Sequence, residues 1–495
     1  MSALLICGLF VTGIHQKFEN GGIDEFVIIE KNNLGIALLV LVGGIALVLG
    51  FLKIADVITT RFNINVNAVA AVVCALSFII SVTWINILKV VPGADQEFCV
   101  NYANAMNNGD FTCLQQGQYL ANYPHLLGII AFLRLLFKIF GEGNYDAYRY
   151  FNAICVPVMI YAGYRIVKKF TNDDKKTELF YLAAMLFCIP AYAYVLYIYG
   201  DLGGPALGIL SFWFFYECLE KLSVKNITGF VLSTIASITI RKNMLIFVIA
   251  MVIVLVISLI KRVQKQDLIL LAIVMLTTVF SLKYVEWLYL PEKVDVDHAV
   301  PAICNITMGL NDDKGYAGWY NYYELVVMAD NDWEPEAAAN ESMNAIRGVY
   351  IPLFVHDPKY AADFFFRKIN SQWQVPLYQS IVSNILLYGP QNDFVMSVYF
   401  GTWNRIFEWF MKIYQIAMYL FIAYLLFADR KNKKEIDWYA MLIAAFGGFL
   451  LSCVWESKAR YIFPYFIIMI PFYAFGAKLM YEKIILTIRG KMSDV

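Results

Sequence analysis

The segment Asn33–Leu52 reads NLGIALLVLVGGIALVLGFL and contains no charged residue. As a helix it would rise about 30 Å, which is the thickness of the hydrocarbon core of a bilayer. Comparable apolar runs occur at Tyr150–Val167, Met244–Ile260 and Ile406–Ala428, and short charged joints separate the runs. The sequence therefore predicts an all-α polytopic membrane protein.

The composition of the whole chain agrees with this interpretation. Of the 495 residues, 60% are hydrophobic and 16% are charged, against roughly 45–50% and about 25% in a soluble domain. Lys+Arg and Asp+Glu number 39 each, so the net charge is zero. These values exclude a disordered chain, a nucleic-acid-binding domain and a disulfide scaffold.

The distribution of charge predicts which side each joint faces. Lys and Arg collect in the joints after residues 52, 167, 260 and 428 and at the C-terminus, and the positive-inside rule places these joints in the cytoplasm. The stretch from Pro92 to Pro124 has no Lys or Arg but carries Asp95, Glu97 and Asp110. We therefore expect this loop on the outer side, together with Gly200–Gly204 and the segment from about Pro291 to Arg405.

The charges predict about twelve crossings with both termini in the cytoplasm. We expect three parts: a transmembrane module over residues 1–290 with an outer loop at 92–149, an outer segment at 291–405, and C-terminal transmembrane helices at 406–495. Tyr123–Phe140 is apolar but carries Arg134 and Lys138, so it is expected to lie along the outer surface. The run Ser2–Ile14 is short for a crossing.

Three acids on the predicted outer face are candidates for chemistry. Asp95 and Glu97 follow a span that ends at Trp84–Val91, and a carboxylate at such a position can take a proton from a hydroxyl group. Asp201 lies in the turn Tyr199–Pro205, where it can cap the next helix, orient an acceptor or bind a metal ion together with Asp95. Solvated loop acids are the simpler explanation for Asp95 and Glu97. Cys99 and Cys113, in the same outer loop, can be a disulfide or two free thiols.

Several cations on the same face oppose the charge bias. Arg is suited to phosphate because its guanidinium group forms two parallel hydrogen bonds. Any one of these cations can also anchor a helix end at the interface, whereas several that converge require an anion, for which a lipid phosphate is the natural candidate. The cations are Arg149, Arg241, Lys242, Arg367, Lys368, Lys458 and Arg460.

The outer segment is rich in aromatic and small polar residues, as at Gly315–Asn321 and Asn370–Trp373. Aromatic faces with neighbouring amides hold sugar rings, but they equally pack a small domain against a membrane. The sequence leaves both interpretations open.

The order of the motifs resembles the GT-C superfamily of membrane glycosyltransferases, in the branch of protein O-mannosyltransferases, aminoarabinose transferases and their bacterial relatives. An acid pair after an early span is followed by a Tyr-Pro step, a surface helix ending in Phe-Gly, an Arg that opens a span, an outer acid and a late Arg-Tyr-x-x-Pro. In this chain the motifs are Asp95-Gln96-Glu97, Tyr123-Pro124-His125, Phe140-Gly141, Arg149, Asp201 and Arg460-Tyr461-Ile462-Phe463-Pro464.

The resemblance implies transfer of a sugar, with inversion, from a polyprenyl-phosphate donor to a hydroxyl acceptor on a lipid, glycan or protein. The reaction would take place on the extracytoplasmic face of a bacterial plasma membrane. By the same resemblance Asp95 is the general base, Asp201 the second acid, and the role of Glu97 is open because Gln96 separates the two acids. Arg149, Arg241, Lys242, Lys458 and Arg460 would bind the donor phosphate, and Tyr123, His125, Tyr316, Trp373 and Tyr461 would line the substrate groove. A divalent metal ion on Asp95 and Asp201 is left open.

The main alternative function is a transporter or flippase for a lipid-linked or amphipathic solute, and a further alternative is a non-catalytic membrane assembly or receptor protein with a folded outer segment. The centres of the predicted spans are almost free of charged residues, whereas transporters place ionisable groups near the middle of the bilayer. The enzyme hypothesis requires that Asp95 and Asp201 lie near one another at the outer boundary, beside a groove that is open to lipid and lined by cations.

Overall fold

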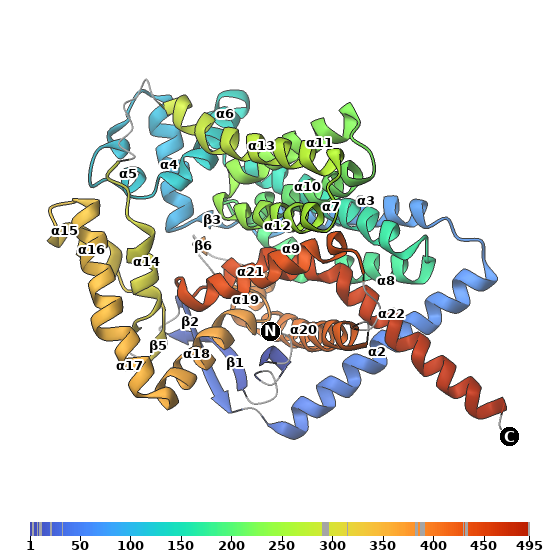
Figure 1. Ribbon diagram of the computed structural model, residues 1–495. Helices are drawn as coiled ribbons and strands as arrows, with labels where there is room; N and C mark the ends of the chain where they lie inside the picture. Colours follow the sequence, from blue (N-terminus) through green and yellow to red (C-terminus); the bar gives the residue numbers. More distant parts are fainter. Residues whose placement is uncertain are drawn as a thin grey trace.

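The computed structural model describes residues 1, 4–6, 8, 12–19, 22–31, 33–289, 297–313, 315–381, 385–386, 392–428, 430 and 434–493. Within these residues the chain is a bundle of helices with three two-stranded sheets (Figure 1). The predicted fold class, an all-α polytopic membrane protein, is confirmed.

Eight helical stretches in the described part of the chain are long and apolar enough to cross a membrane. Two bent helix pairs, with angles of 101° and 48°, raise the number to ten if each pair is one span. The prediction of about twelve crossings is therefore not confirmed. The long helices are α2 (Leu34–Arg61), α3 (Val66–Ile87), α7 (Asp146–Thr171), α12 (Leu245–Lys261), α13 (Lys265–Tyr289), α20 (Thr402–Ala428), α21 (Ala440–Val454) and α22 (Phe463–Ser493).

The remaining bundle helices pack between these spans. They are α8 (Lys175–Leu186), α9 (Ile189–Ala193), η3 (Tyr194–Leu196), α10 (Gly203–Glu220), α11 (Val224–Ile240) and η4 (Lys242–Met244), with α19 (Asp393–Phe400), η8 (Ile436–Tyr439) and η9 (Ala459–Ile462) beside the last three spans. The most apolar part of α22 is 89% buried, whereas α2 exposes large apolar side chains such as Leu39, Val42 and Leu47. Such exposure is expected of a surface that faces lipid rather than water.

A second group of elements gathers at one end of the bundle, on the left in Figure 1. The group comprises α4 (Asp95–Asn107), η1 (Thr112–Leu114), α5 (Tyr119–Asn122), η2 (Pro124–Leu126), α6 (Leu127–Phe140), α14 (Ala302–Gly309), α15 (Tyr323–Asp330), α16 (Pro335–Ala345), the π-helical turn η6 (Ile346–Tyr350), α17 (Ile351–His356) and α18 (Pro358–Trp373). The joint between α2 and α3 and the C-terminal end of α22 lie at the opposite end (Figure 1). Segments predicted to be outside are thus separated from joints predicted to be cytoplasmic, although the orientation itself stays a prediction.

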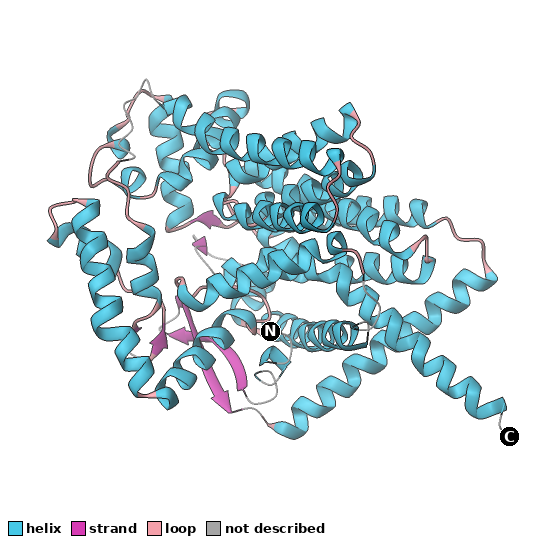
Figure 2. Ribbon diagram, viewed as in Figure 1, coloured by secondary structure: helices cyan, strands magenta, loops and turns pink. Residues whose placement is uncertain are grey.

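The described strands are few. Strand β1 (Thr12–Glu19) pairs antiparallel with β2 (Gly22–Lys31), and this hairpin contacts α18 (Figure 2). The other sheets pair β3 (Val91–Pro92) with β6 (Ile385–Leu386), and β4 (Asp312–Asp313) with β5 (Tyr316–Ala317). Part of the run Ser2–Ile14 lies outside the described residues, and its last three residues belong to β1.

Helix α6 covers the range predicted as a surface helix. The chain bends by 101° between the segment 112–122 and the segment 124–140, so α6 departs sharply from the element before it. Arg134 packs over the rings of Phe111 and Tyr289, at 5.5 and 5.6 Å from their centroids. The position of α6 relative to the bilayer surface stays a prediction.

One glycine permits the close approach of α6 to α11. A Cβ atom added to Gly128 would lie 2.1 Å from the carbonyl oxygen of Thr239. Because backbone is in the way, we expect Gly128→Ala to destabilise the protein by about 1–3 kcal/mol. Thermal unfolding in detergent measures the loss, with Gly43→Ala as the control, since no heavy atom lies within 4 Å of the Cβ position there. An equal unfolding temperature for both variants would contradict this view of the contact.

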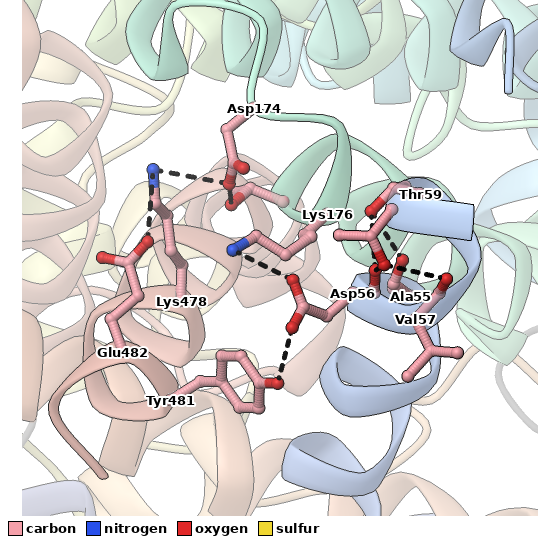
Figure 3. A network of polar contacts seen from close by, with 11 residues as sticks. Ala55, Asp56, Val57, Thr59, Asp174, Lys176, Lys478, Tyr481 and Glu482 are labelled. Carbon is pink, nitrogen blue, oxygen red and sulfur yellow. Dashed lines mark hydrogen bonds and ion pairs between the residues drawn. The ribbon is translucent and has the colours of Figure 1, made fainter. Parts of the chain in front are cut away.

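Polar contacts fasten three helices at the end opposite to α4 (Figure 3). Asp56 of α2 accepts a hydrogen bond from the hydroxyl of Tyr481 at 3.2 Å and lies 3.5 Å from Nζ of Lys176. Lys478 lies 3.4 Å from Asp174, just before α8. These contacts tie α2 and α8 to α22, and so hold the end of the bundle that lacks the candidate catalytic acids.

Candidate active site

Asp95 forms an ion pair with Arg460 between the first residue of α4 and the start of the last span. Arg460 Nη2 lies 2.9 Å from Asp95 Oδ2, and the hydroxyl of Tyr119 donates to Oδ1 at 3.3 Å. Ala94, just before the helix, has φ 48°, so the chain turns sharply into α4. An acid in the first turn is stabilised by the partial positive charge of a helix N-terminus. The side chain of Asp95 remains 28% exposed, so a ligand can reach it.

Asp201 forms a second ion pair, with Arg241. Arg241 Nη2 lies 3.1 Å from Asp201 Oδ1, and Nη1 donates to the carbonyl of Tyr199 at 3.0 Å. Asp201 is only 1% exposed. Its carboxylate therefore holds Arg241 in place and is not open to solvent.

The two arginines share a pair of tyrosine rings. The guanidinium carbon of Arg241 lies 5.1 Å from the ring centroid of Tyr199 and 5.7 Å from that of Tyr461. The guanidinium carbon of Arg460 lies 5.0 and 5.3 Å from the same two centroids. These contacts join Asp95 and Asp201 into one cluster through their two arginines. The groove that the enzyme hypothesis also requires stays a prediction.

The surroundings shift the pKa values of the two acids in opposite directions. Burial would raise the pKa of Asp95, but the positive charges of Arg460 and Lys458 outweigh it, so that the pKa lies below its ordinary value. Burial raises the pKa of Asp201 in spite of the opposing charge of Arg241. Asp95 is therefore the acid that is both ionised and accessible, and Asp201 is the enclosed one.

Gln96 explains the unusual spacing of the two acids in the motif. Its side chain is fully buried, and its Oε1 accepts a hydrogen bond from the backbone N–H of Ile198 at 2.6 Å. This bond ties α4 to the segment that leads to Tyr199 and Asp201. Glu97 points away and is exposed, so the structure does not bring it into the cluster.

Two further acids, Glu324 and Glu456, lie beside the cluster and were not singled out from the sequence. Glu324 of α15 is 1% exposed and accepts from the hydroxyl of Tyr123 at 2.9 Å. Glu456 is 7% exposed, accepts from the hydroxyl of Tyr461 at 3.0 Å and lies 3.5 Å from Nζ of Lys458. Glu456 could have been singled out from the sequence, because it is an acid four residues before Arg460. No comparable signal in the sequence marked Glu324, because its partner Tyr123 is 201 residues away.

A buried lysine positions the segment that precedes Arg460. Lys368 Nζ donates to the carbonyls of Gly309 and Trp455, at 2.6 and 2.7 Å, and to the hydroxyl of Ser457 at 3.1 Å. Three acceptors match the three N–H groups of an ammonium ion. Lys368, predicted only as one of the outer cations, therefore connects α18 and α14 to the segment carrying Glu456, Lys458 and Arg460.

Other predicted site residues lie outside the cluster. Arg149 binds Asp146 and the carbonyls of Val90 and Leu196, so it fastens α7 to neighbouring segments. Trp373 is fully buried and donates to Ser452. Tyr316 lines a separate cavity of about 250 Å³, with Trp319 and Arg367. Lys242, which follows the cluster residue Arg241, is exposed, and so is His125, whose ring centroid lies 6.1 Å from that of Tyr123.

Asp95 and Asp201 are poorly suited to a metal ion. Each carboxylate is engaged by a guanidinium group, and the described residues contain no group of three or more His, Cys, Asp or Glu side chains that could hold a metal. Cys99 and Cys113 are two free, buried thiols.

Comparison with known proteins supports the predicted resemblance. Residues 125–284, less than half of the chain, match the model of the dolichyl-phosphate-mannose-protein mannosyltransferase family. The match includes Arg149, Asp201 and Arg241 but not Asp95 or Arg460. It indicates a multi-pass membrane glycosyltransferase that uses a polyprenyl-phosphate sugar donor. No curated protein matched the chain.

Proposed function

We propose that the chain transfers a sugar from a polyprenyl-phosphate donor to a hydroxyl acceptor on the extracytoplasmic face of a bacterial plasma membrane, with inversion at the anomeric carbon. The observation that carries this proposal is the Asp95–Arg460 pair. It combines an accessible carboxylate with a fixed cation at the end of the bundle where the predicted outer segments gather.

In this mechanism Asp95 takes the proton of the acceptor hydroxyl as the oxygen attacks the anomeric carbon. The bond from that carbon to the phosphate oxygen breaks, and the electron pair leaves with the lipid phosphate. A positioned carboxylate contributes roughly 10²–10⁴-fold to such a step. Asp201 stays on Arg241 and acts by positioning it.

In this mechanism the Asp95–Arg460 ion pair makes the positive charge of Arg460 available to the phosphate only during the reaction. In the resting state Asp95 balances Arg460, and Asp201 balances Arg241. When Asp95 receives the proton its charge is cancelled, so the charge of Arg460 becomes available as the leaving phosphate becomes more negative. Fixed cations aimed at charge that develops in the transition state are the usual source of such stabilisation.

Family and geometry favour this enzyme over the alternative of a transporter or flippase. The ion pairs of the cluster come from α4 and from the short segments before α10, α12 and α22 rather than from span centres. A sugar transferase needs its groups at the membrane surface, where the acceptor arrives.

Identification of the bound lipid tests the proposal directly. The full chain, purified in a mild detergent, should carry a polyprenyl phosphate or its glycosylated form, which mass spectrometry of the extracted lipid identifies. Addition of a hydroxyl acceptor should then release bare polyprenyl phosphate. Lipid that crosses a vesicle membrane with its sugar still attached would instead point to a flippase.

A further inference from the structure

A cavity of about 350 Å³ lies at the end of the bundle opposite to the candidate active site. The joint between α2 and α3, residues 63–67, forms one wall, and side chains from the end of α7 to the start of α8 form the other. The volume falls within the range of ligand pockets, roughly 300–1,000 Å³. Both joints are among those that the charge bias predicts to be cytoplasmic.

One wall of this cavity presents hydrogen-bond donors. Asn63, Asn65 and Asn67 are exposed, and the amide oxygen of each already accepts a hydrogen bond from the protein. Their three NH₂ groups donate to no acceptor within the described residues. An NH₂ group donates and cannot accept, so this wall is suited to a ligand with several acceptor oxygens.

Lys175 adds a positive charge to the same wall. Its Nζ donates to Oδ1 of Asn63 at 3.3 Å and forms no ion pair in the part of the chain that the structure describes. Lys168, by contrast, lies 3.2 Å from Oδ1 of Asp173. A cation beside several amide donors is a suitable environment for a phosphate group, which accepts hydrogen bonds at each of its free oxygens.

The cavity also contains two carboxylates, which a simple anion would not tolerate. Asp173 is exposed, and Glu178 lines the cavity although it is only 2% exposed. With Lys168 and Lys175 the two acids leave the described lining without net charge. A ligand that carries an ammonium group as well as a phosphate satisfies both sets of groups, because an ammonium group donates to carboxylates.

The surface beside the cavity indicates that this ligand is a lipid. Ile154, Tyr161 and Lys168 follow one another at intervals of seven residues, about two helical turns, so they share one face of α7. Ile154 and Tyr161 are exposed, as are Val72 and Ile79 on the neighbouring α3. Acyl chains can pack along these exposed apolar side chains while the headgroup occupies the cavity. Basic pockets between spans are known to hold phospholipid headgroups in this way.

We propose that the cavity binds the headgroup of a zwitterionic phospholipid with a primary amine, of which phosphatidylethanolamine is the simplest. Its phosphate accepts from Lys175 and the three asparagine amides, and its ammonium group donates to Glu178 and Asp173. The bound lipid bridges the two joints and therefore stabilises the folded protein. The inference does not rest on the proposed sugar transfer, because the cavity lies at the other end of the bundle.

Binding of defined lipids to the full, delipidated chain in detergent tests the inference. Native mass spectrometry gives the affinity for the first molecule of phosphatidylethanolamine, phosphatidylcholine or phosphatidylglycerol. Phosphatidylcholine has the same phosphate, but its quaternary ammonium has no N–H group to donate, and phosphatidylglycerol has no ammonium group at all. We expect the wild-type protein to bind phosphatidylethanolamine at least tenfold more tightly than either of the others, and to unfold at a higher temperature when this lipid is added.

Two variants test the two ends of the headgroup separately. Lys175→Gln should lower the affinity for phosphatidylethanolamine and phosphatidylcholine alike, by roughly 10- to 100-fold, because it removes a charge-assisted hydrogen bond to the phosphate. Glu178→Gln should lower the affinity for phosphatidylethanolamine to that for phosphatidylcholine and leave the latter within twofold. Lys225→Gln is the control: it changes an exposed lysine in the first turn of α11 and should leave every affinity within twofold.

Three outcomes would overturn the proposal. The first is equal affinity of the wild-type protein for the three lipids, a comparison that needs no variant and carries the test if the variants do not fold. The second is wild-type affinity for phosphatidylethanolamine in both Lys175→Gln and Glu178→Gln. The third is displacement of phosphatidylethanolamine by an equal concentration of inorganic phosphate, which would assign the cavity to a soluble phosphate instead of a lipid.

Discussion

Asp95→Asn is expected to lower the rate of sugar transfer by about 10²–10⁴-fold while donor binding persists. Asparagine keeps the shape of the side chain and can still accept a hydrogen bond from Arg460, but it cannot take the proton of the acceptor. The measurement is single-turnover release of polyprenyl phosphate, with the unfolding temperature recorded for both proteins. Glu97→Gln, two residues further along α4 and exposed, is the control and should retain wild-type turnover.

The pH profile gives an independent check of the same assignment. Because the pKa of Asp95 lies below its ordinary value, the acid limb of kcat/KM should lie at lower pH than the ordinary pKa of an aspartate predicts. Lys458→Gln removes one of the charges that lower this pKa, so the limb should move to higher pH. Full turnover by Asp95→Asn would rule out Asp95 as the base. An acid limb of kcat/KM that lies at the same pH in Lys458→Gln as in the wild type would do so as well.

Arg460→Ala is expected to weaken donor binding by roughly 30- to several thousand-fold, which corresponds to about 2–5 kcal/mol for the loss of one partner of a buried charge pair. Arg460 is 2% exposed, contacts Asp95 and donates to the hydroxyl of Tyr197 at 2.6 Å. Binding of polyprenyl phosphate measures the effect.

Two variants make this result interpretable. Lys138→Ala removes an exposed cation of α6 and should change binding by less than twofold. Arg460→Lys keeps the charge but loses the planar guanidinium group, so its affinity for the donor should lie between those of the wild type and Arg460→Ala. Equal and negligible losses in Arg460→Ala and Lys138→Ala would remove Arg460 from the donor site.

The parts of the site that could be predicted from the sequence are those that chain position reveals. Asp95 and Asp201 stand just outside long apolar runs, and Arg460 opens the last one, so hydropathy alone brings them to helix ends. The spacing Asp95-Gln96-Glu97 appeared to be a departure from the family pattern. It has a physical cause, because Gln96 points inward to the backbone of Ile198 while Glu97 points outward.

The parts that could not be predicted depend on contacts between distant segments. Glu324 reaches Tyr123 across 201 residues, and Lys368 reaches Trp455 across 87. Neither pairing leaves a local periodicity. The backbone contacts of Arg149 could not be predicted either: carbonyls of Val90 and Leu196 accept from its N–H groups, and its role as a phosphate ligand stays a prediction.

The number of crossings stays unconfirmed for a related reason. Hydropathy counts apolar runs, but α8 and α9 bend by 48° at their joint, and the segments 112–122 and 124–140 bend by 101°. An apolar run that folds back against its neighbours has the same composition as one that passes straight through the bilayer.

The three bonds of Lys368 have a consequence for anyone who treats the segment 302–373 as a detachable module. They anchor α18 and the end of α14 to the same short segment that presents Arg460. A chimaera that exchanges this segment with a homologue, without also exchanging residues 455–460, would mismatch an ammonium group with its three acceptors. Such transplants would therefore fail at the chemical step even where both parts fold, and inheritance of the two segments as one unit is what the architecture demands.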